Sequence, residues 1–239
     1  SPGAPLDEVR FAGLERVNPD TLHAEIDTRA GAPLDQATLD RDIRRLYGRG
    51  DFEHVGYTLD ERDGRRVLTV QAVEKSWGPN YLRFGLGLST DFAGVSYFNL
   101  LATHRSTWLN ALGAEWRNEF QVGRTMRAVT EWYQPLGATQ RFFVAPRLSV
   151  EQTPIDFYDQ RLRVASYRTL SSKASLDVGT QFTKFGELRL GVERGLIDYS
   201  RETGTVDGST ESARFHRGGA SLRLRLDQLD SVVLPRSGY

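Results

Sequence analysis

Between Tyr81 and Gly238 the chain repeatedly places an apolar residue at every second position. The clearest runs are residues 82–88 and 220–226, in which leucine, phenylalanine or alanine alternates with arginine, glycine or serine. Alternation of this kind puts apolar side chains on one face of a β-strand and polar side chains on the other. No later helix or second sheet is encoded to cover the apolar face. The pattern therefore predicts membrane-spanning strands whose apolar face meets lipid.

The alternating region divides into about eight expected strands. One of them, the sixth, contains Leu170-Ser171-Ser172-Lys173, which could be taken for a break. Apolar residues on both sides of this segment keep to even numbers, and an intervening turn could have shifted that phase, so we expect one uninterrupted strand. The expected ranges are 81–91, 95–104, 107–120, 124–134, 140–152, 161–182, 186–199 and 212–227.

The two faces of these strands have different expected surroundings. One face carries charges of both signs on neighbouring strands and is expected to line a polar lumen, either as a structural wall or as a track for a substrate. These lumen-facing residues are Glu115, Arg117, Glu119, Arg127, Glu131, Arg141, Arg147 and Glu151. The other face is expected to anchor in lipid or at its surface through the aromatic residues Phe98, Trp108, Trp116, Trp132 and Phe142.

Residues 1–76 follow a different pattern and are expected to form a small α+β domain with the order strand, helix, helix, strand, strand. Asn18 before Pro19 is typical of a helix start, and Asp35 is the expected N-cap of the second helix. The expected elements are a strand over 6–11, a helix from 19 to about 26, a helix from 36 to Gly48 or Gly50, and strands over 52–60 and 65–74 joined at Asp63-Gly64.

The second helix has an expected buried stripe of Leu39, Ile43, Leu46 and Tyr47. Four arginines surround this stripe, and we interpret them as a solvated face rather than an anion site. They are Arg41, Arg44, Arg45 and Arg49.

Residues 77–80 are expected to link the two regions at the inner surface of the membrane. Gly78 and Pro79 end the preceding strand, while Trp77 and Tyr81 suit an interfacial belt of aromatic residues. The expected division is thus 1–76, 77–80 and 81–239.

Composition narrows the function classes. The 31 basic and 31 acidic residues are interspersed and give a net charge of zero, which offers no support for a nucleic-acid partner. There is no cysteine, so neither a disulfide nor a thiolate zinc site is available. The four histidines lie far apart in sequence, and no arrangement for a metal, a cofactor or a catalytic nucleophile is expected. A mean hydropathy of -0.45 is compatible with a barrel, which hides its apolar half in alternation.

The first region resembles a POTRA domain. The likeness lies in Val9–Gly13 of the first strand, in Gly31–Leu34 before the second helix and in Leu46–Phe52 after it. The resemblance implies a periplasmic domain that stands in front of an outer-membrane barrel of the BamA-like superfamily and receives polypeptide in transit.

The later region also resembles this superfamily, through a turn motif carried by Asp230, Pro235 and Gly238. The resemblance implies a barrel of sixteen strands, of which eight would be the N-terminal half. The alternative is that eight strands close alone into a narrow barrel. The chain begins without a signal peptide, and we expect it to be a piece of a longer protein.

Within the superfamily, the chain looks most like the patatin-type autotransporters of type V secretion, subclass d. The likeness lies in Lys75–Leu82, in Tyr133–Leu136 and in the single POTRA-like module. It implies a lipolytic patatin domain ahead of these residues, which contain no Gly-x-Ser-x-Gly nucleophile elbow of their own.

The sequence therefore predicts a non-enzymatic translocator or anchor that secretes or displays a fused passenger at the bacterial outer membrane. The expected partners are outer-membrane lipid, the passenger polypeptide, the barrel-assembly machinery and periplasmic chaperones. The alternatives are a barrel-insertion factor, a two-partner secretion transporter, and a soluble β-rich protein that binds lipid or carbohydrate.

Overall fold

A computed structural model describes residues 4–90, 96–159, 162–183, 186–204 and 212–226. These residues form two compact units, each of which is described by itself. The first unit contains residues 1–80 together with two short later segments, Ser106–Ala114 and Leu136–Gln140. The second contains the remaining strands. No described helix is long and apolar enough to cross a membrane.

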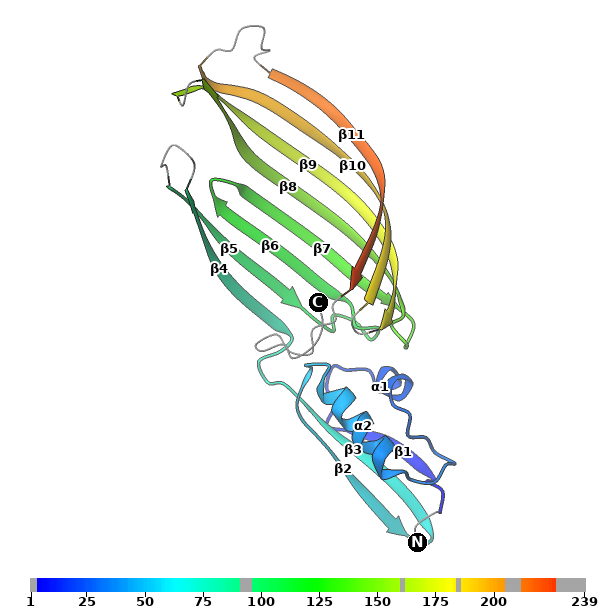
Figure 1. Ribbon diagram of the computed structural model, residues 1–239. Coiled ribbons are helices and arrows are strands. Elements are labelled where there is room, and N and C mark those ends of the chain that lie inside the picture. The colour runs from blue at the N-terminus through cyan, green and yellow to red at the C-terminus, as the bar shows by residue number, and fades with distance from the viewer. Residues whose placement is uncertain (1–3, 91–95, 160–161, 184–185, 205–211, 227–239) are drawn as a thin grey trace. The chain divides into compact units, whose positions relative to one another are not determined.

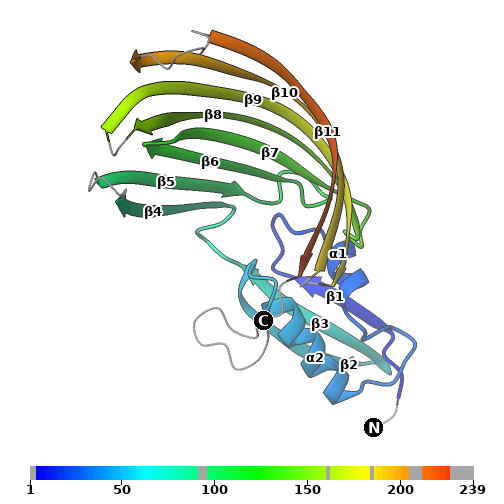
Figure 2. The ribbon, with the colours of Figure 1, turned by 45° about the horizontal axis from the view of Figure 1, so that its top comes forward.

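The N-terminal module has the expected order of elements (Figure 1). Its sheet has the order β1-β3-β2, with β1 parallel and β2 antiparallel to β3. Both Figure 1 and Figure 2 show α2 lying along the β2–β3 hairpin. The elements are β1 (Glu8–Ala12), α1 (Pro19–Glu25), α2 (Gln36–Tyr47), β2 (Phe52–Arg62) and β3 (Arg65–Glu74).

Local signals explain where these elements begin and end. The Asn18 side chain accepts a hydrogen bond from the Asp20 N–H, and the Asp35 side chain accepts one from the Thr38 N–H, so both predicted N-caps are confirmed. Asp63 and Gly64 both have positive φ, of 51° and 75°, as a two-residue hairpin turn requires.

The core of the module lies between the helices and one face of its sheet. Leu39 and Leu46 of α2 are buried and Ile43 packs against them, but Tyr47 is 59% exposed, so its assignment to the buried stripe was wrong. The fully buried members of this cluster are Leu6, Leu22, Ile26, Leu39, Leu46, Phe52, Leu68, Val70 and Ala72.

Asp42 takes a buried position on α2 that the apolar stripe did not reveal. Its carboxylate accepts hydrogen bonds from the Asp27 N–H at 3.0 Å, from the Thr28 N–H at 2.8 Å and from the Thr28 hydroxyl at 2.7 Å. Asp42 therefore fixes the segment that follows α1 against the middle of α2.

Of the four arginines predicted to form a solvated face, Arg41 and Arg44 are exposed, whereas Arg45 of α2 and Arg49 just after it are partly buried. Arg45 donates to Asp27 at 3.1 Å and lies 3.5 Å from the Asp42 carboxylate. Arg49 is ion-paired with Glu25 and with Asp51. Burial by itself lowers the pKa of Arg49, but these carboxylates outweigh it and raise the pKa above its ordinary value.

A second buried carboxylate belongs to Glu74, the last residue of β3. One of its oxygens accepts hydrogen bonds from the backbone N–H groups of Glu15, Arg16 and Val17 at 2.8–2.9 Å, and the other pairs with the Arg16 guanidinium at 2.9 Å. Burial alone would raise the pKa of Glu74. The three backbone donors and Arg16 outweigh burial, so the pKa lies below its ordinary 4.5.

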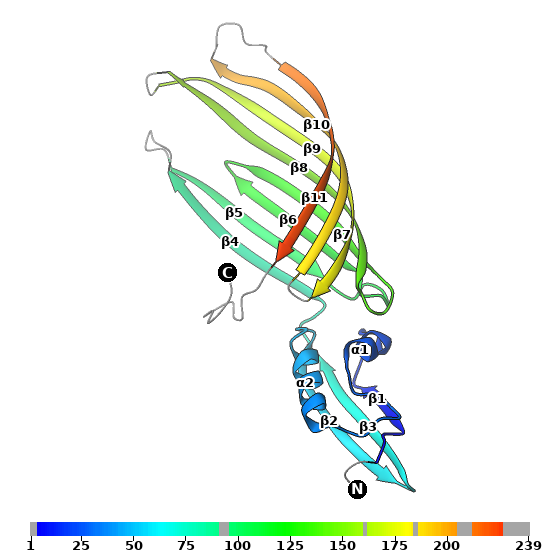
Figure 3. The ribbon, with the colours of Figure 1, turned by 45° about the vertical axis from the view of Figure 1, so that its right-hand side comes forward.

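The described part of the later chain forms eight antiparallel strands, which confirms the predicted number (Figure 3). They lie in sequence order from β4 to β11 in one open sheet, with β4 and β11 as its edges in the described residues. The alternative of a closed eight-stranded barrel is therefore not what the structure has. The strands are β4 (Asn80–Thr90), β5 (Ser96–Ser106), β6 (Glu115–Gly123), β7 (Met126–Leu136), β8 (Phe142–Asp159), β9 (Leu162–Thr183), β10 (Gly186–Gly204) and β11 (Ser212–Leu226).

The two faces of this sheet follow residue parity. β9 runs without interruption for 22 residues, as predicted, and pairs odd with odd and even with even residues along most of its length with β8 and β10. We call the two sides the odd face and the even face. On β4 the even face carries Leu82, Phe84, Leu86 and Leu88, each between 65% and 77% exposed. An apolar face left open in this way does not fit a soluble β-rich protein.

The largest errors in the predicted strand boundaries lie at the ends of β8 and β10, which run to Asp159 and Gly204 rather than to 152 and 199, and at the start of β6. Residues 107–114 form a turn rather than the start of β6, because the Asn110 side chain accepts hydrogen bonds from the N–H groups of Leu112 and Ala114. Trp108, predicted to face lipid, has a φ of 55° and packs against the core cluster of the first unit, with the Arg49 guanidinium 5.6 Å from its ring.

Candidate functional site

The eight predicted lumen-facing charges all have odd numbers, and those on β6, β7 and β8 lie on the odd face. Register places Arg117 directly opposite Glu131, Gln121 opposite Arg127, and Arg147 opposite Ser175. Arg141 precedes β8, and its carbonyl accepts a hydrogen bond from the Gln181 N–H at 2.7 Å. Two separate groups of ion pairs arise from these residues.

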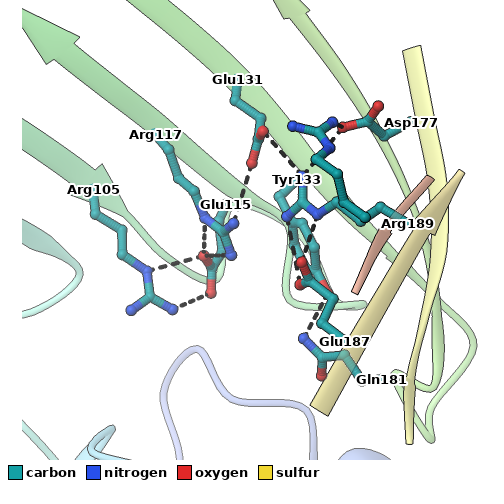
Figure 4. Close-up of polar contacts among 10 residues, drawn as sticks. Arg105, Glu115, Arg117, Glu131, Tyr133, Asp177, Gln181, Glu187 and Arg189 are labelled. Carbon is teal, nitrogen blue, oxygen red and sulfur yellow. Dashed lines mark hydrogen bonds and ion pairs between the residues drawn. The ribbon is translucent and has the colours of Figure 1, made fainter. Parts of the chain in front are cut away.

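The larger group begins on β5 and β6. Arg105 of β5 donates to both oxygens of Glu115, at 2.9 and 2.5 Å (Figure 4). Arg117 donates to Glu115 at 2.8 Å and to Glu131 of β7 at 3.1 Å. The chain of alternating charge thus crosses three strands without a gap.

The same group continues through residues that the sequence analysis had not singled out. Arg189 of β10 donates to the second oxygen of Glu131 at 3.2 Å, to Asp177 at 3.5 Å and to Glu187 at 2.5 Å. Arg223 of β11 also pairs with Asp177. We call this group the charge belt. It consists of Arg105, Glu115, Arg117, Glu131, Asp177, Glu187, Arg189 and Arg223.

Two small residues lie on the strands between Arg189 and Glu131. Gly179 of β9 lies directly opposite both Arg189 and Phe143, and Ala145 of β8 lies opposite Asp177. A Cβ at Gly179 would come within 2.4 Å of the Phe143 ring and 2.5 Å of the Leu188 carbonyl oxygen. A side chain at position 179 would therefore displace the Phe143 ring, over which the Arg189 guanidinium lies.

Two aromatic rings form the floor under the belt. The Tyr133 and Phe143 rings lie 4.6 Å apart and are buried. The Arg117 guanidinium lies 4.2 Å from the centre of the Tyr133 ring, and that of Arg189 lies 5.0 Å from the Phe143 ring. The Tyr133 hydroxyl accepts a hydrogen bond from Gln181 at 2.8 Å. Stacking on these rings adds to the ion pairs in holding both arginines.

The smaller group links β6, β7 and β8. Arg127 lies 3.3 Å from Glu119 and 3.7 Å from Glu151, on the odd face. Both groups join strands that are neighbours or near neighbours in the sheet. The charge belt contains four arginines and four carboxylates, so its formal charges sum to zero.

This arrangement suits a polar wall whose strands are joined by ion pairs between side chains. Each belt carboxylate contacts at least one arginine, so the charges are compensated within the face. The described residues hold no group of three or more histidine, aspartate or glutamate side chains placed to bind a metal ion. The chemistry available here is recognition by charge and hydrogen bonding.

Parity could have identified the missed members of the belt, because Arg105, Asp177, Glu187, Arg189 and Arg223 are odd-numbered like the predicted charges. Their contacts could not have been predicted, since Arg189 and Glu131 are 58 residues apart.

The linker residues have mixed surroundings. Trp77 is 61% exposed, and the Lys75 ammonium lies 5.6 Å from its ring. Arg16 donates to the Gly78 carbonyl at 3.1 Å, and the Pro79 carbonyl accepts from the Thr107 N–H at 3.0 Å. Tyr81 lies in β4. The predicted turn motif of Asp230, Pro235 and Gly238 lies outside the described residues.

The module can now be assigned. Residues 4–75 match the family model described as "POTRA: Surface antigen variable number repeat". This stretch is a POTRA domain. The match agrees with the β1-β3-β2 sheet and the two helices.

Solved structures extend the likeness to the sheet. The chain superimposes on BamA from Haemophilus ducreyi lacking POTRA domains 1–3 with a TM-score of 0.71 and 14% identity, covering 98% of this chain and 46% of that one. CdiB from Escherichia coli gives a TM-score of 0.51 at 14% identity, covering 95% and 42%. The fold is therefore a POTRA domain followed by half of a BamA-like barrel, as the sequence predicted.

A curated relative is similar at the level of sequence. The outer membrane protein assembly factor BamA of Nitratidesulfovibrio vulgaris is 24% identical over 135 residues, which is 56% of this chain and 16% of that protein. The chain thus spans less than half the length of the proteins that it matches. The predicted location is confirmed: the strands belong to the outer membrane and the POTRA domain to the periplasm.

Proposed function

We propose that this chain is the POTRA domain and half-barrel of an outer-membrane translocator that secretes or displays a passenger fused to it. The passenger we favour is a patatin-like lipolytic domain outside these residues. The observation that carries the proposal is the combination of one POTRA domain with a sheet whose two faces differ, apolar on the even face and cross-paired by charge on the odd face.

The POTRA domain offers a place where polypeptide in transit can bind. In the described residues β2 pairs with β3 alone and is an edge of its sheet. An edge strand presents backbone N–H and C=O groups to which an extended segment can add without a particular sequence. The passenger would be captured at β2 and passed to the barrel.

Deletion of residues 1–74 from the whole protein tests the guiding role. We expect the barrel to remain in the outer membrane, where heat-dependent migration on a gel reports its folding, and surface display of the passenger to be lost. Undiminished display would contradict the proposal.

A sharper experiment uses adjacent prolines in β2. Successive residues of a strand direct their N–H groups to opposite sides, so Thr58→Pro and Leu59→Pro differ in whether the lost N–H faces β3 or solvent. The variant that removes the outward N–H should reduce display while the domain stays folded, and the other should destabilise the domain. Undiminished display in the variant whose domain stays folded would argue against capture at this edge.

A second candidate function is barrel insertion, which the likeness to the assembly factor BamA supports; a two-partner secretion transporter is the further alternative. The coding sequence upstream of these residues distinguishes the three alternatives. A patatin-like reading frame favours the first proposal, further POTRA repeats favour barrel insertion, and a separately encoded exported partner favours two-partner secretion. Barrel-assembly machinery and periplasmic chaperones are proposed helpers in each case.

A further inference from the structure

One charged side chain on the even face stands alone. Arg194 is exposed and belongs to β10, which lies between β9 and β11 (Figure 1). No hydrogen bond or ion pair joins it to another residue in the described part of the chain. All other even-numbered acidic and basic residues in the described strands of the eight-stranded sheet are ion-paired. The pairs are Asp156 with Arg124, Arg168 with Glu202, and Asp198 with Arg214.

The immediate neighbours of Arg194 are uncharged. On its own strand it is flanked on the same face by Val192 and Leu196, which are 61% and 37% exposed. Directly opposite it lie Ala174 of β9 and Gly218 of β11. These small residues leave the guanidinium uncovered and give it no acceptor, so its partner must come from outside the sheet.

Strand geometry places Arg194 just below the outer edge of the apolar band. The POTRA domain is periplasmic and directly precedes β4, so β4 runs outward, and β10 runs the same way because consecutive strands alternate in direction. Leu188 and Asp198 are ten residues apart, which is about 25 Å of height for a tilted strand. An apolar band about 25 Å tall therefore ends near Asp198, about 10 Å above Arg194.

The material against this face is lipid, because the strands belong to the outer membrane and the apolar side chains of the even face are exposed. A guanidinium inside the hydrocarbon is unfavourable, and an arginine near its boundary extends toward the headgroups. The strongest acceptor there is phosphate, which takes paired, charge-assisted hydrogen bonds from arginine. Arg194 is thus placed to reach a phosphate of the outer leaflet.

A second donor lies on the same path. His216 of β11 is directly opposite Leu196, one residue pair further out than Arg194, and it is exposed. It too has no hydrogen bond or ion pair within the described ranges. Diagonal neighbours on one face of a sheet are about 7–8 Å apart, within reach of long side chains. We call Arg194 and His216 the basic pair.

We propose that the basic pair binds the phosphate of a lipid headgroup in the outer leaflet, while the acyl chains of the same lipid lie against Val192 and Leu196. The occupant is a lipid rather than a soluble anion because exposed apolar side chains surround the pair. The pair lies on the face opposite the charge belt. Binding there anchors the wall in the membrane whichever polypeptide the protein transports.

Native mass spectrometry of the whole protein in a non-ionic detergent tests the proposal. The probe is bisphosphorylated lipid A, and the comparison lipid is the same molecule without its phosphates. Arg194→Gln should weaken binding of lipid A about tenfold. The matched control is Arg217→Gln, which removes an arginine next to His216 from the odd face and should leave binding unchanged. The wild-type protein should bind the phosphate-free lipid about tenfold more weakly than lipid A.

Heat-dependent migration on a gel checks that each variant is folded. If Arg194→Gln does not fold, His216→Gln replaces it, with an expected loss of about threefold because one of the two donors remains. Equal binding by the wild type and Arg194→Gln, an equal loss in Arg217→Gln, or equal binding of the two lipids would overturn the inference. Displacement of lipid A by excess inorganic phosphate would also overturn it, because the site would then recognise a soluble anion.

Discussion

Apolar and polar residues alternate in both sheets of this protein, but the two sheets bury opposite faces. The POTRA sheet buries its apolar face, whereas the eight-stranded sheet leaves its apolar face open. In the POTRA domain the apolar side of β3 is covered by helices, and Leu68 and Ala72 are fully buried. In the eight-stranded sheet the apolar even face is open and the odd face holds the buried groups, among them Asp177 at 1% exposure. Alternation therefore determines which residues share a face of a strand. Which of the two faces is buried depends on what packs against it.

Buried carboxylates are also held differently in the two regions. Glu74 and Asp42 of the POTRA domain accept hydrogen bonds mainly from backbone N–H groups. Glu131 and Asp177 of the sheet are held by arginines from other strands. Strand N–H groups are already used in the sheet ladder, so compensation in the sheet must come from side chains.

The largest expected effect comes from placing a charge on the even face. Leu176→Arg in the middle of β9 should destabilise the membrane-embedded barrel by about 2–4 kcal/mol, because lipid cannot solvate the guanidinium. The neighbouring Ser175→Arg puts the same charge on the odd face and should cost far less. Denaturant unfolding in liposomes measures both, and equal destabilisation would show that the even face does not meet lipid.

The second-largest expected loss of stability follows removal of the Glu74 carboxylate. Glu74→Ala leaves three backbone N–H groups without their acceptor and should destabilise the POTRA domain by about 2–3 kcal/mol. Hydrogen exchange of the β3 amides reports the change. Glu53→Ala, at an exposed position of β2, is the matched control and should have little effect.

Adding a methyl group at Gly179, under the charge belt, should destabilise the barrel less than the two changes above. Gly179→Ala would collide with Phe143 and the Leu188 carbonyl, at a cost of about 1–3 kcal/mol. Gly219→Ala has open space around the added carbon and should be close to neutral. If denaturant unfolding of the barrel does not separate the two variants, the close packing of Phe143 and the Leu188 carbonyl around Gly179 is not important for stability.

The smallest expected effect is that of pH on the POTRA domain. Because the folded pKa of Glu74 lies below its ordinary 4.5, its contribution to stability is complete above that value and declines as the pH falls through the lowered pKa. The melting temperature of the domain should therefore fall below pH 4.5. Glu74→Gln keeps an acceptor oxygen but no charge, so its melting temperature should depend less on pH; an unchanged slope would contradict the role given to the carboxylate.

Much of the fold followed from the sequence because local signals were sufficient. Asn18, Asp35 and the Asp63-Gly64 turn each act within four residues, and the even-numbered apolar residues across Leu170-Ser171-Ser172-Lys173 were enough to predict one strand for β9. The failure at Trp108 has a physical reason. The alternation was extended beyond the strand into a turn held by Asn110, and the partner of the Trp108 ring, Arg49, lies 59 residues earlier in the chain.

By itself, the sequence determined the order of the elements and the side of each strand on which a residue lies, because both depend on neighbours along the chain. Only the tertiary structure decided which charges meet. Arg189 of β10 donates a hydrogen bond to Glu131 of β7 across the two strands between them, and Asp42 is buried where the segment after α1 brings its N–H groups to it. Contacts of this kind depend on shape and distance in space, which alternation along a chain does not encode.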